Sequence, residues 1–333
     1  MSDMTAASRD APPHPPPLHN MSSFNGRFMH FAAISDWRLC VASAQELEQA
    51  RALLQKHRNN VPSSSSTDSD ALELRKASAL YQSAYHPDTG DLQNFVGRMS
   101  FQVPGGMLLT GAMLAFYRST PAVVFWQWAN QSFNALVNYT NRNAASDLTG
   151  AQLGMAYTTA TTAALATALG LKKLLSGAKR FAVLQRFVPF MAVAAANVVN
   201  IPLMRQNEVV VGVRLLDDQG QHAGNSKSAA VKGISQVVSS RIVMAAPGML
   251  LLPLIMQQVE RLRWYRSPMN LPLQTLMCGA SLTLMVPLAC ALYDQKCSVN
   301  VAQLEASEPE LYSALQQKYG DQLPSTLSFN KGL

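Results

Sequence analysis

Amide side chains recur along residues 119–141, a stretch without charged residues. In a helix, residues three, four or seven apart share one face, and several of these amides have that spacing. Amides can donate to a carboxylate and accept from an ammonium or hydroxyl without carrying a charge. The pattern predicts a site for a small zwitterion or, alternatively, hydrogen bonds between helices. The amides selected on this pattern are Asn130, Gln131, Asn134, Asn138 and Asn141.

Two further polar residues are candidates for substrate binding. Asn200 stands within the uncharged stretch 187–204, and Arg241 directly precedes the uncharged stretch 242–259. Residues 233–240 are also uncharged, so Arg241 is expected to lie deeper than an arginine at a membrane edge. Edge arginines usually extend to the lipid headgroups. A buried one needs a carboxylate or carbonyl partner, which could be the carboxylate of a substrate.

A turn is predicted at His86-Pro87-Asp88-Thr89-Gly90. Proline fixes φ and glycine tolerates a left-handed backbone, so the pair favours a tight turn and a possible helix cap. The alternative is a gating role at a membrane entrance, in contact with a gate or a solute. Pro202 belongs to the same gating hypothesis, because a proline inside a membrane helix frees carbonyls that a solute can use. The simpler alternative for such prolines is an ordinary kink.

Six uncharged stretches are the elements that would position these residues. A helix rises 1.5 Å per residue, so about 18–20 apolar residues cross a bilayer core of about 30 Å. The first two stretches are interpreted as fewer than two full crossings, because amides facing lipid are costly. A soluble all-helical protein with a thick core is the alternative. The stretches are 99–117, 119–141, 148–171, 187–204, 242–259 and 267–293.

We therefore predict an all-α fold, a multi-pass membrane helical bundle of about five transmembrane helices with a small helical N-terminal region. The bundle would occupy residues 99–293 and take the lipid bilayer as its partner. The proline-rich residues 1–20 are expected to be disordered, and residues 21–98 to form a soluble or interfacial helical region. Residues 294–333 are expected to be a polar tail with one short helix.

Other function classes find little support in the sequence. Cys40, Cys278, Cys290 and Cys297 show no C-x-x-C spacing and no nearby histidine pair, so neither a metal site nor a disulfide framework is expected. The net charge of +7 is spread over the edges of apolar stretches, which argues against a nucleic-acid surface. No nucleophile–base pair or phosphate loop appears. We therefore expect no enzyme, no catalytic residue and no cofactor.

Several strings occur in an order that carries a resemblance. Together they closely resemble the sideroflexins, in particular the serine-transporting branch, over residues 22–333. Trp37 departs from this pattern, since the family usually has proline after the aspartate at this point. The strings include Phe24-Asn25-Gly26-Arg27, the 86–90 turn, Gly97-Arg98-Met99-Ser100, residues 125–142 (FWQWANQSFNALVNYTNR), residues 200–206 (NIPLMRQ), residues 246–249 (APGM) and residues 329–333 (FNKGL).

The resemblance implies a multi-pass protein of the mitochondrial inner membrane. It would import serine, and also alanine, glycine or cysteine, to supply matrix one-carbon metabolism. The alternative is a non-transporting scaffold or assembly factor linked to iron homeostasis, although the chain shows no ligand cluster for iron. Neither the preferred amino acid, nor ion coupling, nor the oligomeric state follows from the sequence.

Charge predicts the orientation of the bundle. The loop 172–186 carries five positive and no negative charges, and the loop 260–266 carries three arginines against one glutamate. The positive-inside rule places both loops in the matrix. The loop 205–241 and the C-terminus would then face the intermembrane space. Five crossings would leave the N-terminus in the matrix.

Overall fold

The computed structural model describes residues 15–59, 68–87, 89–141, 149–175, 182–263 and 265–331. The chain is mostly helical, as predicted. Among the described residues, two helical segments are long and apolar enough to cross a membrane, Lys227–Val259 and Ser267–Ala291. A shorter apolar helix covers Val188–Met204.

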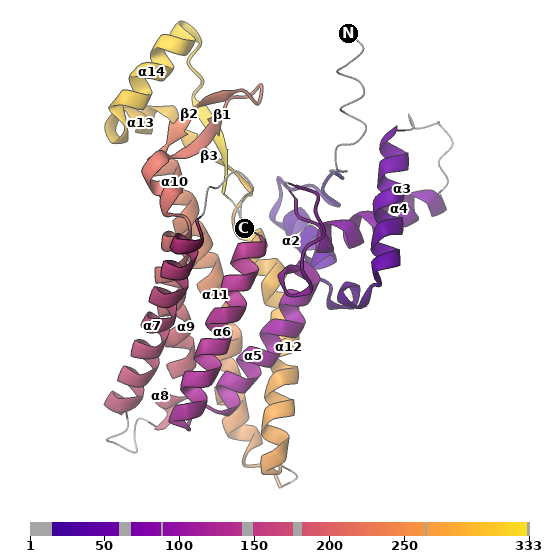
Figure 1. The fold of residues 1–333 in the computed structure, drawn as a ribbon, viewed down its shortest axis with the longest axis vertical. Helices are drawn as coiled ribbons and strands as arrows, with labels where there is room; N and C mark the ends of the chain where they lie inside the picture. The colour runs from indigo at the N-terminus through magenta and orange to yellow at the C-terminus, as the bar shows by residue number, and fades with distance from the viewer. Residues whose placement is uncertain are drawn as a thin grey trace.

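Each of the six uncharged stretches contains or overlaps a helix of one elongated bundle (Figure 1). Successive helices run up and down, and α5 and α6 form an antiparallel hairpin. The expected count of about five is therefore not confirmed, because the first two stretches form two separate helices. With 14 residues, α5 is about 21 Å long, shorter than a bilayer core. The helices are α5 (Gln102–Ala115), α6 (Thr120–Thr140), α7 (Gly150–Leu175), α9 (Val188–Met204), α11 (Lys227–Val259) and α12 (Asn270–Ala291).

The prolines do not break these helices. Pro202 lies two residues before the end of α9, while α11 continues through Pro247 and Pro253 and α12 through Pro287. The structure therefore agrees with the kink alternative rather than with interrupted helices.

Small residues lie on two opposite faces of α7, one buried and one exposed. Ala156, Ala160, Ala164 and Ala168 are buried at intervals of four residues, and α7 packs closely along α9. Small side chains let helix backbones approach. The opposite face, which includes Gly154 and Gly170, is exposed, so α7 lies at the bundle edge rather than in its centre.

The N-terminal region is helical, as predicted. Glu46 N donates to Ser43 Oγ (3.2 Å) and Ser43 N donates to Glu46 Oε2 (2.7 Å), which is the reciprocal capping expected at the start of α3. Leu47 and Leu54 of α3 pack against Tyr81 of α4. Most of the segment expected to be disordered, 1–20, lies outside the described residues. The elements are α2 (Phe24–Ile34), η1 (Trp37–Val41), α3 (Ala44–Asn59), α4 (Asp68–Ala84), η2 (Phe95–Gly97) and η3 (Met99–Phe101).

A four-stranded antiparallel sheet corrects the all-α prediction. Two strands come from the expected C-terminal tail and two from the segment between α9 and α11, in the order β2-β1-β4-β3. Leu215, Leu304, Leu315 and Phe329 form a core between the sheet and two short helices. The elements are α10 (Gln206–Val211), β1 (Val213–Leu216), β2 (His222–Ser226), β3 (Lys296–Asn300), α13 (Val301–Ser307), α14 (Pro309–Tyr319) and β4 (Thr326–Asn330).

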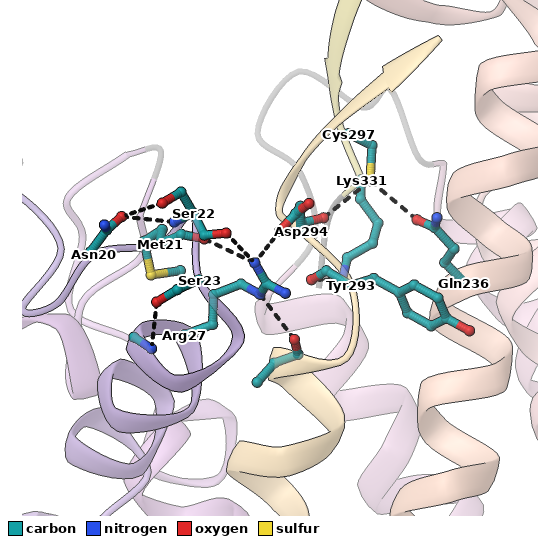
Figure 2. Close-up of polar contacts among 12 residues, drawn as sticks. Asn20, Met21, Ser22, Ser23, Arg27, Gln236, Tyr293, Asp294, Cys297 and Lys331 are labelled. Carbon is teal, nitrogen blue, oxygen red and sulfur yellow. Dashed lines mark hydrogen bonds and ion pairs between the residues drawn. The ribbon is translucent and has the colours of Figure 1, made fainter.

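The N-terminal helices and the sheet lie at the same end of the bundle, which we call the terminal end (upper in Figure 1). Buried Arg27 of α2 forms an ion pair with Asp294, just after α12, and its Nε donates to Ala291 O (2.9 Å) (Figure 2). This arrangement contradicts the expectation that the two terminal regions lie on opposite sides. An even number of antiparallel helices returns the chain to the end where it began.

The opposite end, which we call the basic end, carries both basic loops. Arg186 NH2 and Glu260 Oε2 lie 2.8 Å apart and join the segment before α9 to the end of α11. The short helix α8 (Ala182–Gln185) also lies there (Figure 1). The described parts of the two basic loops therefore lie at the same end of the bundle, and their side of the membrane stays a prediction.

Candidate solute-binding site

The middle of α6 buries a cluster of amides. Gln127, Asn130 and Gln131 are only 2%, 8% and 2% exposed. Asn130 is at the midpoint of the 21-residue helix, about 15 Å from either end. The cost of exposing amides to lipid predicts this burial, and α6 packs against α5, α7 and α9. We call these three residues the amide cluster.

The amide cluster has unused hydrogen-bonding capacity. Gln127 Oε1, Asn130 Nδ2 and Gln131 Nε2 are buried without a hydrogen-bond partner. Leaving such a group unpaired costs about 1–3 kcal/mol. One acceptor and two donors complement a hydroxyl or ammonium and a carboxylate, which are the groups of a small amino acid.

The same stripe of α6 continues to the terminal end, where its last amide is paired. Asn134 and Asn138 are half-buried. Asn141 is fully used, because its Nδ2 donates to Gly97 O (2.8 Å) and its Oδ1 accepts from Gln93 Nε2 (2.8 Å). For Asn141 the structure therefore favours the interhelical hydrogen-bond alternative.

A small pocket lies on the basic-end side of the amide cluster. Side chains of α5, α6 and α9 line it, including Met113, Trp126, Gln127 and Val188. Its cavity volume is about 10 Å³, room for about one water molecule. Gln127 is thus shared between the pocket and the amide cluster.

The other predicted binding residues lie on neighbouring helices. Asn200 of α9 is 5% exposed, and Arg241 of α11 is half-buried. Arg241 makes no hydrogen bond or ion pair with the described part of the chain, and it lies within electrostatic range of Cys290 of α12. Neither Asn200 nor Arg241 is hydrogen-bonded to the amide cluster.

The predicted turn is present, at the terminal end. Gly90 N donates to His86 O (2.9 Å), Thr89 N donates to His86 Nδ1 (3.3 Å), and Gly90 has φ = 70°. Pro87 lies in the turn, while Asp88 lies outside the described residues. Three residues further on, Gln93 contacts Asn141, so the turn is connected to the end of α6. A gating role stays a prediction.

Gln127 and Arg27 were not identified as candidate residues from the sequence. Gln127 lies three and four residues before Asn130 and Gln131, and that helical spacing could have identified it. Arg27 has partners 264 and 267 residues away, Ala291 and Asp294, and no local pattern reveals them.

Comparison with known proteins identifies the family of this chain. The sideroflexin family model matches residues 14–333. The chain belongs to this family. It is 54% identical to sideroflexin-2 of Drosophila melanogaster over 319 residues, covering 95% of this chain and 96% of that one. It is 47% identical to Homo sapiens sideroflexin-2 over 335 residues, covering 100% and 99% of the two chains.

Sideroflexin-1 of Homo sapiens is 46% identical over 319 residues, covering 95% of this chain and 96% of that protein. No solved structure matches this sideroflexin. The resemblance drawn from the sequence strings is thereby confirmed at the level of the family. The departure at Trp37 lies in η1 and is 50% exposed, remote from the amide cluster along the chain.

Proposed function

We propose that this sideroflexin is a mitochondrial inner-membrane transporter that carries serine, and also alanine, glycine and cysteine, into the matrix. The observation that supports it is the amide cluster, with three unpaired polar atoms at the centre of α6. Transport requires a site that holds the solute by reversible hydrogen bonds, without covalent chemistry. The scaffold alternative gives no reason to keep such atoms buried and unpaired, because apolar residues would pack there without that cost.

Neutral amides suit a zwitterionic solute at membrane depth. The amide N–H groups of Asn130 and Gln131 can donate to its carboxylate, while the amide oxygen of Asn134, about 6 Å along the helix axis from Asn130, can accept from its ammonium. Asn138, about 12 Å from Asn130 along the axis, lines the route to the site. In this scheme Asn200 and Arg241 line the route from neighbouring helices. Arg241 attracts the carboxylate near the terminal end, since it lies within electrostatic range of Cys290, almost at the end of α12.

We further propose that the bundle crosses the membrane with its basic end in the matrix. The positive charge of the 172–186 and 260–266 loops supports this orientation. Six crossings then place both terminal regions in the intermembrane space. Protease should digest tags at both termini in mitochondria with a ruptured outer membrane, before the inner membrane is dissolved. Protection of one tag alone would contradict a six-helix crossing.

The gate at the terminal end is proposed to be the 86–90 turn and its neighbours. Gln93 N donates to Ala84 O (2.9 Å), which holds the Gln93 side chain against Asn141. Opening would separate these contacts from the end of α6. Pro202, near the end of α9 at the same end of the bundle, removes one backbone donor there and eases bending.

Uptake of labelled serine into proteoliposomes that contain only this protein tests the proposal. We expect saturable uptake above protein-free vesicles, competition by alanine, glycine and cysteine, and a lower rate for Asn134→Ala with unchanged folding. The absence of saturable uptake by correctly folded protein would reject transport and leave the scaffold alternative.

A further inference from the structure

The pocket beside the amide cluster has a nearly apolar wall. Apart from Gln127 and Tyr117, whose hydroxyl accepts a hydrogen bond from Arg118 Nε (3.1 Å), its lining side chains are predominantly aliphatic or aromatic. The rings of Phe116 and Trp126 are stacked, with centroids 6.2 Å apart and planes 7° from parallel. Met113 is 4% exposed and packs with Trp126 and Val193. These contacts fix the shape of the wall.

The pocket is also small. A cavity volume of about 10 Å³ holds about one water molecule, so a hydroxyl or a methyl group is the largest group that fits without movement of the wall. Packed interiors resist such movement, and inserting extra methylenes is costly. The pocket therefore sets a size limit that the side chains of alanine, serine and cysteine, with one or two heavy atoms, meet and that the branched side chains of threonine and valine exceed.

Gln127 lines this pocket and carries an unpaired hydrogen-bond acceptor. Its side chain is 2% exposed, and its Oε1 has no partner. Asn130 and Gln131 follow three and four residues later, about 4.5–6 Å further along the helix axis. That separation is within the reach of one amino acid, with its carboxylate at Asn130 and Gln131 and its side chain at Gln127.

We infer that the pocket receives the side chain of the transported amino acid, and that Gln127 selects serine over alanine by accepting a hydrogen bond from its hydroxyl. This inference rests on the proposed transport function. A methyl group leaves Oε1 unpaired and desolvated, whereas a hydroxyl pairs it. Sites built to hydrogen-bond a hydroxyl discriminate far more strongly than sites that only measure size.

The test compares serine and alanine uptake in proteoliposomes that contain wild type, Gln127→Met or Met113→Ala. Gln127→Met keeps the volume of the side chain and removes the acceptor. We expect its serine-to-alanine uptake ratio to fall about tenfold, with alanine uptake within about twofold of wild type. Gln303→Met, an exposed change outside the bundle, is the matched control and should keep the wild-type ratio. Met113→Ala should let threonine and valine compete with serine.

The outcomes distinguish a failure of the side-chain pocket from a failure of the proposed transport function. An unchanged ratio in folded Gln127→Met, or an equal loss of serine and alanine uptake, would overturn the side-chain pocket while transport stands. If Gln127→Met does not fold, Met113→Ala provides the test. An unchanged range of amino acids that compete with serine would then overturn the side-chain pocket. Absence of uptake by wild type would reject transport itself, and the pocket with it.

Discussion

Two buried polar regions of this sideroflexin differ in how completely they are paired. The first, which we call the Arg27 junction, joins Arg27, Tyr293, Asp294, Cys297 and Lys331 where α2, α12 and the sheet meet (Figure 2). Arg27 is 7% exposed, and its guanidinium binds the side chain of Asp294 and several carbonyl oxygens. Lys331 is 3% exposed and donates to Tyr293 O (3.1 Å). The amide cluster is equally buried but holds three unpaired atoms.

We interpret the paired groups of the Arg27 junction as holding the fold and the unpaired amides as a proposed solute-binding site. At the Arg27 junction a cation meets the carbonyl end of α12, where the helix dipole favours positive charge. Cys297 Sγ donates there too, with Asp294 O at 3.1 Å and Gln236 Oε1 at 3.2 Å. Pairing of this kind stabilises an arrangement of elements. Unpaired amides at the centre of a helix bundle reduce stability, and we propose that they are kept because they bind the solute.

Substitution in the amide cluster should give the largest effect on transport. Asn130→Leu removes an unpaired donor, so we expect the free energy of unfolding to stay the same or rise. Serine uptake should fall about tenfold or more, as one lost hydrogen bond to a charged group is worth about 1.5–3 kcal/mol. Proteoliposome uptake and denaturant unfolding of the same preparation measure both. A large loss of stability would mean that Asn130 is a structural residue.

Substitution at the Arg27 junction should show the opposite pattern. We expect Arg27→Gln to lower the free energy of unfolding by about 2–3 kcal/mol, below the 3–5 typical of a broken buried ion pair, because the Asp294 side chain is 56% exposed. Thermal unfolding measures this loss. Arg38→Gln is the matched control, because Arg38 pairs with Asp36 at the surface and should leave the unfolding temperature unchanged.

A smaller, pH-dependent effect is expected in the N-terminal region. Burial, with a contribution from His19, lowers the pKa of His30 from 6.5 to about 4. The ring accepts a hydrogen bond from Leu18 N through Nδ1 (3.3 Å). The folded protein keeps His30 neutral, so stability is full above pH 6.5 and falls as protonation of the unfolded chain increases between about pH 6.5 and 4.

His30→Asn keeps an acceptor and removes this titration. Between pH 7 and about 5.5, wild type should lose about 1 kcal/mol more stability than His30→Asn. Thermal unfolding at several pH values measures the difference. Parallel curves for the two proteins would show that His30 does not couple the N-terminal region to pH.

Features with a local signal could be predicted from the sequence. The uncharged stretches predicted the positions of the bundle helices, because the absence of charge over about 18 residues is a local property. The cost of exposing amides to lipid predicted that Asn130 and Gln131 turn inward. The Ser43–Glu46 capping box likewise marked the start of α3.

Features that depend on residues far apart in the chain could not be predicted from the sequence. Strands β1 and β4 pair across more than 100 residues, through Leu216 and Ser328, and each strand has only four or five residues. Alternation over so short a run is a weak signal. The terminal regions were expected on opposite sides because the crossing count rested on merging two stretches, and the ion pair between Arg27 and Asp294 lay beyond any local pattern.

Serine-dependent stabilisation of the purified protein tests directly whether the unpaired amides of α6 bind the solute. A ligand at ten times its Kd raises the free energy of unfolding by about 1.4 kcal/mol if it binds only the folded state. Serine should raise the unfolding temperature of wild type and of Arg27→Gln, which starts from a lower value, but not that of Asn130→Leu. An equal serine-induced rise in Asn130→Leu and wild type would contradict the claim that the unpaired amides of α6 bind the solute.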